Sequence, residues 1–206
     1  QHVVERCREA KLLSDVILAT DDERIAEVAK EFCTVEMTQN DHPSGTDRIA
    51  EVAARRDCDA VVNVQGDEPL IEPMVIDAVA DALAASEMTT AATPVNNITD
   101  YSDPNTVKVV VSAAGYALYF SRRTIPFVRD LSEESPEQQL AAFPYLKHLG
   151  IYGYKCDTLR RMVAFKPSPL EQAERLEQLR ALENGIAIMV CQVDYDAVGV
   201  DVPEDV

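Results

Sequence analysis

Two neighbouring carboxylates, Asp67 and Glu68, follow a short apolar segment and could either bind a metal ion or close a turn. Residues 60–64 read Ala-Val-Val-Asn-Val, a composition typical of a strand that is buried on both faces. Gly66 interrupts this strand, and the next helical pattern begins near Pro73. Ligands of open α/β sheets bind at the carboxyl ends of such strands, and carboxylates are preferred ligands of Mg²⁺. Asp67 and Glu68 could therefore bind a hard cation such as Mg²⁺ together with a phosphate-bearing substrate. The alternative is that both acids cap the following helix.

Asp201 is the second candidate metal ligand. It follows an apolar segment at residues 186–193 and precedes Pro203, a favourable first residue of a helix. Asp201 is therefore also a good helix N-cap, and the two roles are compatible because helix N-termini at strand ends also hold phosphates. Although Asp67 and Asp201 are far apart in the sequence, we expect them to meet at the carboxyl edge of one sheet.

Arg48 is a candidate for binding an anionic ligand, and His148 is a further candidate residue with a weaker signal. Arg48 lies one turn into a helix expected after Ser44, Gly45 and Thr46, and free backbone N–H groups beside an arginine can hold an anion. The alternative is a solvated surface arginine. His148 precedes an aromatic strand, where packing is the ordinary role of a histidine.

A long helix is expected over residues 170–183, and it carries a group of polar residues. Glu174, Glu177 and Gln178 fall at positions i, i+3 and i+4, which lie on one side of a helix. They could bind the hydroxyl groups of a sugar. The alternative, favoured by the spacing alone, is an exposed charged face.

The elements that must position these residues alternate along the chain. Strands are expected at residues 15–20, 33–37, 60–64 and 89–95, with helices between them, which is the pattern of a doubly wound sheet. Residues 107–112 and 116–120 are expected to form an antiparallel hairpin. Residues 127–140 are acidic and irregular, and we expect a surface loop there. Two later strands are expected at residues 149–154 and 186–193.

Composition limits the classes of function. The chain has 206 residues with 19 basic and 36 acidic side chains, and a formal charge of −17 repels phosphate backbones, which argues against nucleic-acid binding. No apolar run is long enough for a membrane span. Five cysteines lack Cys-x-x-Cys spacing, which argues against a zinc site or a disulfide framework and suits a cytoplasmic protein.

Seven segments, in order along the chain, together resemble the 3-deoxy-manno-octulosonate cytidylyltransferase (CMP-Kdo synthetase) family. They are DHPSGTDR (41–48), VNVQGDEP (62–69), GYALYFSR (115–122), HLGIYGY (148–154), PSPLE (167–171), LEQLR (176–180) and GVDVPED (199–205). The resemblance implies transfer of CMP from CTP to the acidic sugar Kdo, with release of pyrophosphate, for lipopolysaccharide synthesis.

The resemblance also implies roles for individual residues and a state of assembly. Two Mg²⁺ ions are implied, with Asp67 and Asp201 as the catalytic metal ligands. The cytidine is expected near Ser44, Gly45, Thr46 and Gln65. The sugar is expected among Arg48, Gln65, His148, Tyr152, Glu177 and Gln178. The hairpin region, residues 105–125, is the segment through which this family pairs as a homodimer.

One departure from the family pattern concerns the start of the sequence. The family's first strand and the basic, glycine-containing loop that cradles the triphosphate are absent from the sequence as printed, which begins at Gln1. We therefore expect residues 1–206 alone to be inactive. The expected fold is a single α/β domain with a three-layer, Rossmann-like nucleotidyltransferase architecture. Its sheet is mixed and mainly parallel, and a β-hairpin insertion serves for dimerisation.

Three other functions fit less of the sequence. One is an acylneuraminate cytidylyltransferase or another sugar nucleotidyltransferase. Another is a non-catalytic, nucleotide-binding homologue of the enzyme. The last, a purely structural dimerisation domain, leaves the placement of Gln65, Asp67 and Asp201 without an explanation.

Overall fold

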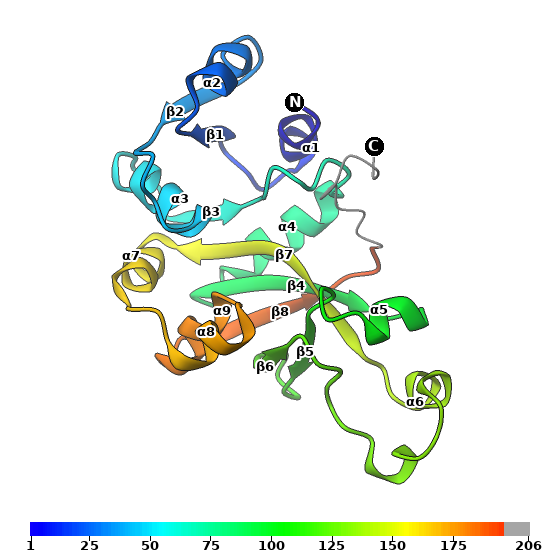
Figure 1. The fold of residues 1–206 in the computed structure, drawn as a ribbon. Coiled ribbons are helices and arrows are strands. Elements are labelled where there is room, and N and C mark those ends of the chain that lie inside the picture. The colour runs from blue at the N-terminus through cyan, green and yellow to red at the C-terminus, as the bar shows by residue number, and fades with distance from the viewer. Residues whose placement is uncertain (196–206) are drawn as a thin grey trace.

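The chain folds into alternating strands and helices followed by a mixed second half (Figure 1). The computed structural model describes residues 1–195, so Asp201 lies outside the described residues. The first half contains α1 (His2–Glu9), β1 (Ile17–Thr20), α2 (Glu23–Ala29), β2 (Thr34–Met37), α3 (Gly45–Ala54), β3 (Ala60–Asn63), α4 (Pro73–Ala82) and β4 (Met88–Pro94). The second half contains α5 (Ile98–Ser102), β5 (Lys108–Val111), β6 (Ala117–Ser121), the 3-10 helix η1 (Arg129–Leu131), α6 (Pro136–Ala142), β7 (Leu146–Lys155), α7 (Cys156–Ala164), α8 (Pro169–Glu174), α9 (Gln178–Glu183) and β8 (Ile188–Gln192).

The central strand of the main sheet is β7. The sheet has the order β6-β5-β7-β4-β8, and β3 also pairs with β7. One edge of β7 pairs with β4 along nearly its whole length. The other edge is shared, because β5 pairs with Leu146 and Lys147 whereas β3 pairs with residues 152–155.

The directions of the strands follow from these pairings. Strands β3, β4 and β5 all run antiparallel to β7, and β8 runs parallel to β4. Four strands of the six-stranded sheet therefore point the same way, while β7 and the edge strand β6 run in the opposite direction. This arrangement is the expected mixed α/β sheet, and β5 and β6 form the expected antiparallel hairpin.

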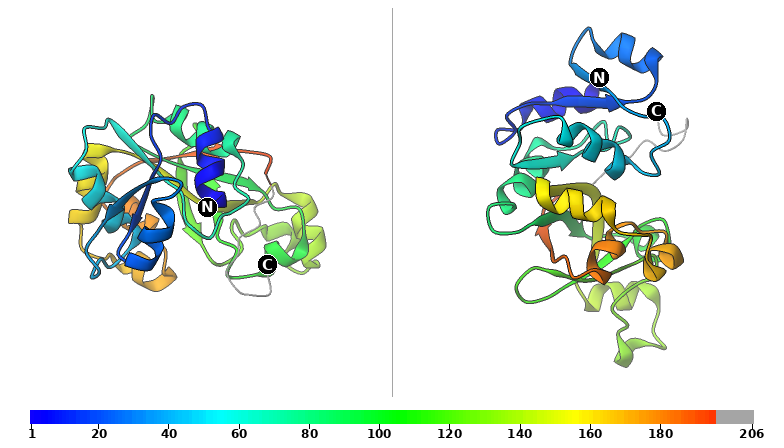
Figure 2. Two further views of the ribbon diagram at one scale, coloured as in Figure 1. Left: turned by 90° about the horizontal axis from the view of Figure 1, so that it is seen from above. Right: turned by 90° about the vertical axis from the view of Figure 1, so that its left-hand side faces the viewer.

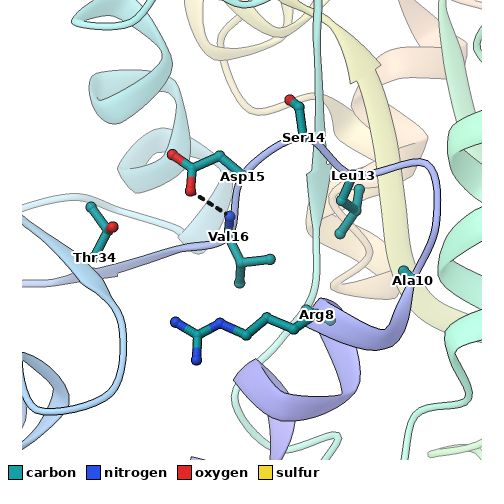
Figure 3. A pocket seen from close by; sticks show the side chains of 8 residues that line it. Arg8, Ala10, Leu13, Ser14, Asp15, Val16 and Thr34 are labelled. Carbon is teal, nitrogen blue, oxygen red and sulfur yellow. Dashed lines mark hydrogen bonds between the residues drawn. The ribbon is translucent and has the colours of Figure 1, made fainter.

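Strands β1 and β2 form a separate, parallel two-stranded sheet. The sequence pattern predicts that they continue one doubly wound sheet with β3, but within residues 1–195 they do not pair with it. Helix α3 contacts both sheets, and a cavity of about 270 Å³ lies beside the small sheet, between α1, residues 10–16 and Thr34 (Figure 3). Figure 2 shows this N-terminal part at one end of the molecule and α6 at the other.

Helices cover both faces of the main sheet and give three layers. On one face α3, α7 and α9 pack over β7 residues Tyr152 and Tyr154. On the other face α1 and α4 pack over Leu149 and Ile151. Because alternate residues of a strand point to opposite faces, this one strand supplies both cores. None of the helices in the described part of the chain is both long and apolar enough to cross a lipid bilayer.

Two further segments differ from the expectations drawn from the sequence. The helix expected over residues 170–183 is broken into α8 and α9, because Arg175 takes a left-handed conformation with φ 55° and Leu176 is buried. Residues 127–140 are not a simple loop, since α6 begins at Pro136. Ser135 and Gln138 form a capping box there, a signal that is visible in the sequence.

Gly153 of β7 lies so close to α4 that a larger residue would clash. A Cβ atom added at Gly153 would lie 2.3 Å from Thr89 Oγ1 and 3.0 Å from Leu83 Cδ1. The Thr89 hydroxyl is itself fixed, because it donates a hydrogen bond of 2.9 Å to the carbonyl oxygen of Val79 in α4.

We predict that Gly153→Ala lowers the free energy of unfolding by about 1–3 kcal/mol, the usual cost of overpacking a core. Urea denaturation followed by circular dichroism measures this loss. The matched control is Gly66→Ala, because a Cβ atom added there meets nothing within 4 Å. Equal midpoints for Gly153→Ala and the unmodified protein would contradict the close packing of α4 on β7.

Candidate active site

The shared edge of β7 leaves a gap between the end of β3 and the start of β5. Asn63 is the last residue of β3 and pairs with Tyr152, whereas Lys108 at the start of β5 pairs with Lys147. In the gap, the carbonyl oxygen of Gly150 accepts a hydrogen bond of 3.1 Å from Gln65 Nε2. The Gln65 side chain thus takes the place of a backbone donor, and it is fixed at the carboxyl end of β3.

Asp67 lies in the turn that follows Gln65. The turn is closed by a hydrogen bond of 3.4 Å from the Glu68 amide to the Gln65 carbonyl oxygen. Asp67 is exposed, and its carboxylate makes no hydrogen bond or ion pair with another residue of the described chain. An exposed carboxylate of this kind suits a hard cation. Within residues 1–195, however, no three His, Cys, Asp or Glu side chains gather into a ready-made metal site.

The segment after β8 runs beside the Asp67 turn. Tyr195 Oη donates a hydrogen bond of 3.0 Å to the carbonyl oxygen of Leu70, and the Tyr195 amide donates one of 3.4 Å to Thr93 Oγ1. Tyr195 and Gln65 also line the same small cavity. The described chain therefore approaches the Asp67 turn shortly before the sequence reaches Asp201.

A second group of predicted residues meets at the N-terminus of α3. Ser44 is the N-cap, and its hydroxyl accepts a hydrogen bond of 3.2 Å from the Asp47 amide. The carboxylate of Glu177, from the break between α8 and α9, lies 3.1 Å from Ser44 Oγ and accepts a hydrogen bond of 2.6 Å from Thr46 Oγ1. Gly45 adds no side chain at this helix start.

The break at Arg175 explains which acids reach this group. Glu174 accepts hydrogen bonds from the Ser121 hydroxyl, at 2.7 Å, and from the Arg122 amide, at 3.0 Å, so it faces β6 rather than Ser44. The expectation that Glu174, Glu177 and Gln178 share one helix face is therefore wrong. Gln178 is buried at the start of α9.

His148 lies in an aromatic environment beneath the sheet gap. Its ring packs edge-to-face on Phe120 and is tilted against Tyr152, with 5.2 Å between ring centroids in each case. Thr90 Oγ1 donates a hydrogen bond of 2.7 Å to the Ile151 carbonyl oxygen, so the 2.8 Å contact with His148 uses the Nε2–H of the imidazole as donor. Burial lowers the pKa of His148 to about 3, so the ring is neutral.

Arg48 does not extend into solvent and does not point at the Ser44 group. Its guanidinium forms an ion pair of 3.1 Å with Asp21 and donates to the Thr38 hydroxyl at 2.5 Å. Tyr152 stacks on Tyr154 with 6.1 Å between the ring centroids. The structure thus brings together Ser44, Thr46 and Glu177, and separately His148 and Tyr152, whereas Arg48 is held beside the small sheet.

The whole chain is similar to proteins of known activity. The cytidylyltransferase family profile matches residues 1–188. The 3-deoxy-manno-octulosonate cytidylyltransferases of Geobacter sulfurreducens and Solibacter usitatus are each 48% identical to this chain in sequence. Each match covers 100% of this chain, and it covers 84% of the first relative and 80% of the second. The chain belongs to the 3-deoxy-manno-octulosonate cytidylyltransferase family.

Solved structures agree with this family membership. The structure of CMP:2-keto-3-deoxy-manno-octonic acid synthetase in complex with CTP matches with a TM-score of 0.89 and 38% identity, over 99% of this chain and 82% of that one. A 4-diphosphocytidyl-2C-methyl-D-erythritol synthase from Anaerococcus prevotii matches with a TM-score of 0.59 at 16% identity, which shows a common fold alone.

Two residues that fix neighbouring candidate residues, Glu51 and Thr90, were not predicted from the sequence. Glu51 of α3 accepts hydrogen bonds from the Gln39 amide, at 3.0 Å, and from the His42 ring, and so ties the loop before Ser44 to the helix. Thr90 fixes His148, as described above. His42 and Glu51 do stand in the sequence close to the Ser44 segment, but their spacing follows no helical or strand period.

The neutral state of His148 predicts a pH dependence of stability. Between pH 6.5 and pH 3 the unfolded chain binds a proton at His148 that the folded chain does not, so stability falls as the pH is lowered through this window. The His148→Gln side chain keeps an N–H donor but cannot titrate. We therefore expect the drop in the free energy of unfolding between pH 7 and pH 5 to be about 2 kcal/mol smaller in this variant than in the unmodified protein.

Urea denaturation of both proteins at the two pH values measures this difference. The control is His2→Gln, since His2 is exposed at the start of α1. If the His148→Gln protein lost as much stability as the unmodified one, His148 would be protonated in the folded state.

Proposed function

We propose that the protein is a 3-deoxy-manno-octulosonate cytidylyltransferase, which transfers CMP from CTP to Kdo and releases pyrophosphate for lipopolysaccharide biosynthesis. The observation that carries this proposal is the 48% identity to the Geobacter sulfurreducens enzyme over 100% of the chain. The similarity to a synthetase solved with CTP supports the nucleotide, and the family name supports the sugar acid.

In this reaction the anomeric hydroxyl of Kdo attacks the α-phosphorus of CTP. A new oxygen–phosphorus bond forms, and the bond between the α-phosphorus and the oxygen that bridges to the β-phosphate breaks. Pyrophosphate leaves with that oxygen, and the proton of the hydroxyl passes to solvent. Because the charge builds on phosphate oxygens, the site has to supply positive charge or hydrogen-bond donors. An acidic chain with a formal charge of −17 makes this requirement stronger.

We propose that Asp67 and Asp201 hold the divalent cation, Mg²⁺, that meets this requirement. When bound, the cation withdraws charge from the phosphate oxygens. Two observations support Asp67: its carboxylate is exposed at the end of β3, and it has no partner elsewhere in residues 1–195. The approach of Tyr195 to Leu70, just before Asp201 in the sequence, supports the second ligand.

The substrate contacts form the next part of the proposal. The cytidine lies near the α3 start, where Ser44, Gly45 and Thr46 offer a helix N-terminus, and near Gln65. The sugar is bound by Arg48, Gln65, His148, Tyr152, Glu177 and Gln178. The neutral imidazole of His148 supports a role as hydrogen-bond partner, not as a cation. To reach the sugar carboxylate, Arg48 has to exchange its ion pair with Asp21.

We also propose that two chains pair through the hairpin region, residues 105–125, and that the protein acts in the cytoplasm. Strand β6 is the edge of the main sheet, and its Leu118 has 63% of its surface exposed, which supports this face as an interface. Free cysteines at all five positions support a reducing compartment. Light scattering would give the mass of two chains if the pairing is correct.

The activity test is pyrophosphate release by the purified full-length gene product. We expect turnover with CTP and Kdo, and at least about tenfold lower kcat/KM when UTP replaces CTP or N-acetylneuraminate replaces Kdo. A preference for N-acetylneuraminate would instead favour the acylneuraminate cytidylyltransferases. CTP binding without turnover would favour a non-catalytic homologue.

In the same assay, Asp67→Asn tests the metal ligand. We expect kcat to fall by at least about a hundredfold, because an amide is a much weaker ligand of Mg²⁺ than a carboxylate. The melting temperature should hardly change, since the side chain has no partner in the described structure. Asp157→Asn is the matched control, because Asp157 is an exposed acid paired with Arg160 on α7. Full activity of Asp67→Asn would remove Asp67 from the proposed site.

A further inference from the structure

Two cysteines that are far apart in the sequence lie side by side in the fold. Cys58 is in the connection between α3 and β3, and Cys156 is the first residue of α7. Their Sγ atoms are 3.0 Å apart, and the residues are separated by 98 positions. Neither residue belongs to the proposed active site.

The backbone, not the two side chains, sets this proximity. Strands β3 and β7 pair up to Ala60 opposite Lys155, and just beyond the last pair the Cys156 amide donates a hydrogen bond of 3.0 Å to the carbonyl oxygen of Asp59. Because Cys58 directly precedes Asp59, the two cysteine side chains extend from adjacent segments of backbone. A disulfide bond of about 2.05 Å requires the sulfurs to approach by only about 1 Å, which a small rotation of the side chains provides.

We propose that Cys58 and Cys156 form a reversible disulfide when the protein meets a two-electron oxidant such as hydrogen peroxide. The disulfide would link the connection that precedes β3 to the start of α7. The proposal does not depend on the proposed transferase activity.

The two thiols differ in accessibility, which gives the order of the steps. Cys58 is partly exposed, whereas Cys156 is buried. Burial, together with the neighbouring Cys58, raises the pKa of Cys156 to about 12. Cys58 therefore meets the oxidant first, and Cys156 acts as the resolving thiol.

The chemistry balances with peroxide as the only co-reactant. The Cys58 sulfur attacks one oxygen of hydrogen peroxide, the oxygen–oxygen bond breaks, and the departing hydroxide takes the Cys58 thiol proton as the first water, which leaves Cys58 as a sulfenic acid. The Cys156 sulfur then attacks the Cys58 sulfur, the sulfur–oxygen bond breaks, and the hydroxide takes the Cys156 proton as the second water. Two thiols and one peroxide thus give one disulfide and two waters.

The other three cysteines do not offer such a pair. In the described residues, no other two cysteine sulfurs lie within hydrogen-bond distance of each other. Burial raises the pKa of Cys7, to about 11, and also raises that of Cys33 and of Cys191. Oxidation at one site is therefore expected to consume two of the five thiols.

The position of the link predicts its effect. It joins the amino end of β3 to the carboxyl end of β7, whereas Gln65 and Asp67 lie beyond the opposite end of β3. A link that closes so long a segment restricts the unfolded chain, so it stabilises the fold. We expect the melting temperature to rise by about 5 °C or more, without a change in the proposed active site.

The experiment treats the full-length gene product with a small excess of hydrogen peroxide and counts thiols after denaturation. We expect the loss of two thiols from residues 1–206, a mass lower by two hydrogen atoms, and a peptide that joins Cys58 to Cys156. Dithiothreitol should restore both thiols and the original melting temperature. Cys33→Ser, the matched control, should behave like the unmodified protein, whereas Cys58→Ser and Cys156→Ser should show neither the joined peptide nor the stabilisation.

Several results would overturn the proposal. One is oxidation that stops at a Cys58 sulfenic or sulfinic acid with Cys156 still free. Others are joined peptides that involve different cysteines, or links between two chains only. Because the unmodified protein alone gives these answers by peptide mapping, the test holds even if a serine variant fails to fold.

Discussion

The long strand β7 is the constraint on which the rest of the fold depends. Its one edge is filled by β4, and its other edge is divided between β3 and β5, which run in the same direction and leave a gap between them. The division leaves a carbonyl oxygen at Gly150 that has to find a donor, and Gln65 provides it. The end of β3, the turn with Asp67 and the start of the hairpin are thereby all placed around one point of the sheet.

Packing on β7 adds a second constraint. Tyr152 and Tyr154 face one core, and Leu149 and Ile151 face the other, so the strand cannot shift by one residue without reversing both faces. Gly153 lets α4 approach closely. His148 is held in its tautomer by Thr90, whose own proton goes to the Ile151 carbonyl oxygen. Hydrogen bonds to the sheet thus fix two of the candidate site residues, Gln65 and His148.

Local pattern was sufficient to locate the strands and the hairpin, because short runs of apolar and β-branched residues bounded by turn residues mark a strand whatever its partner. It failed where a tertiary contact overrides propensity. No residue within 170–183 predicts the left-handed conformation of Arg175. The break accompanies tertiary contacts: Leu176 is buried, and Glu177 contacts Ser44 and Thr46. The separation of β1 and β2 from the main sheet could not be predicted either, because the periodicity of apolar residues does not show which strands pair with each other. The residues of the candidate site were proposed mainly from the family resemblance, because their spacing alone favoured structural roles for most of them.

Several ion pairs attach the small sheet of β1 and β2 to the rest of the chain. A two-stranded sheet is marginal by itself in water. Arg48 pairs with Asp21 at 3.1 Å, and Arg56 pairs with Asp15 at 3.2 Å and with Glu36 at 2.8 Å, so arginines at the two ends of α3 hold both strands. Salt screens such partly exposed pairs. We therefore expect the small sheet to unfold locally without the main sheet, so that its amides exchange hydrogen faster as the ionic strength rises while those of β4 and β7 stay protected.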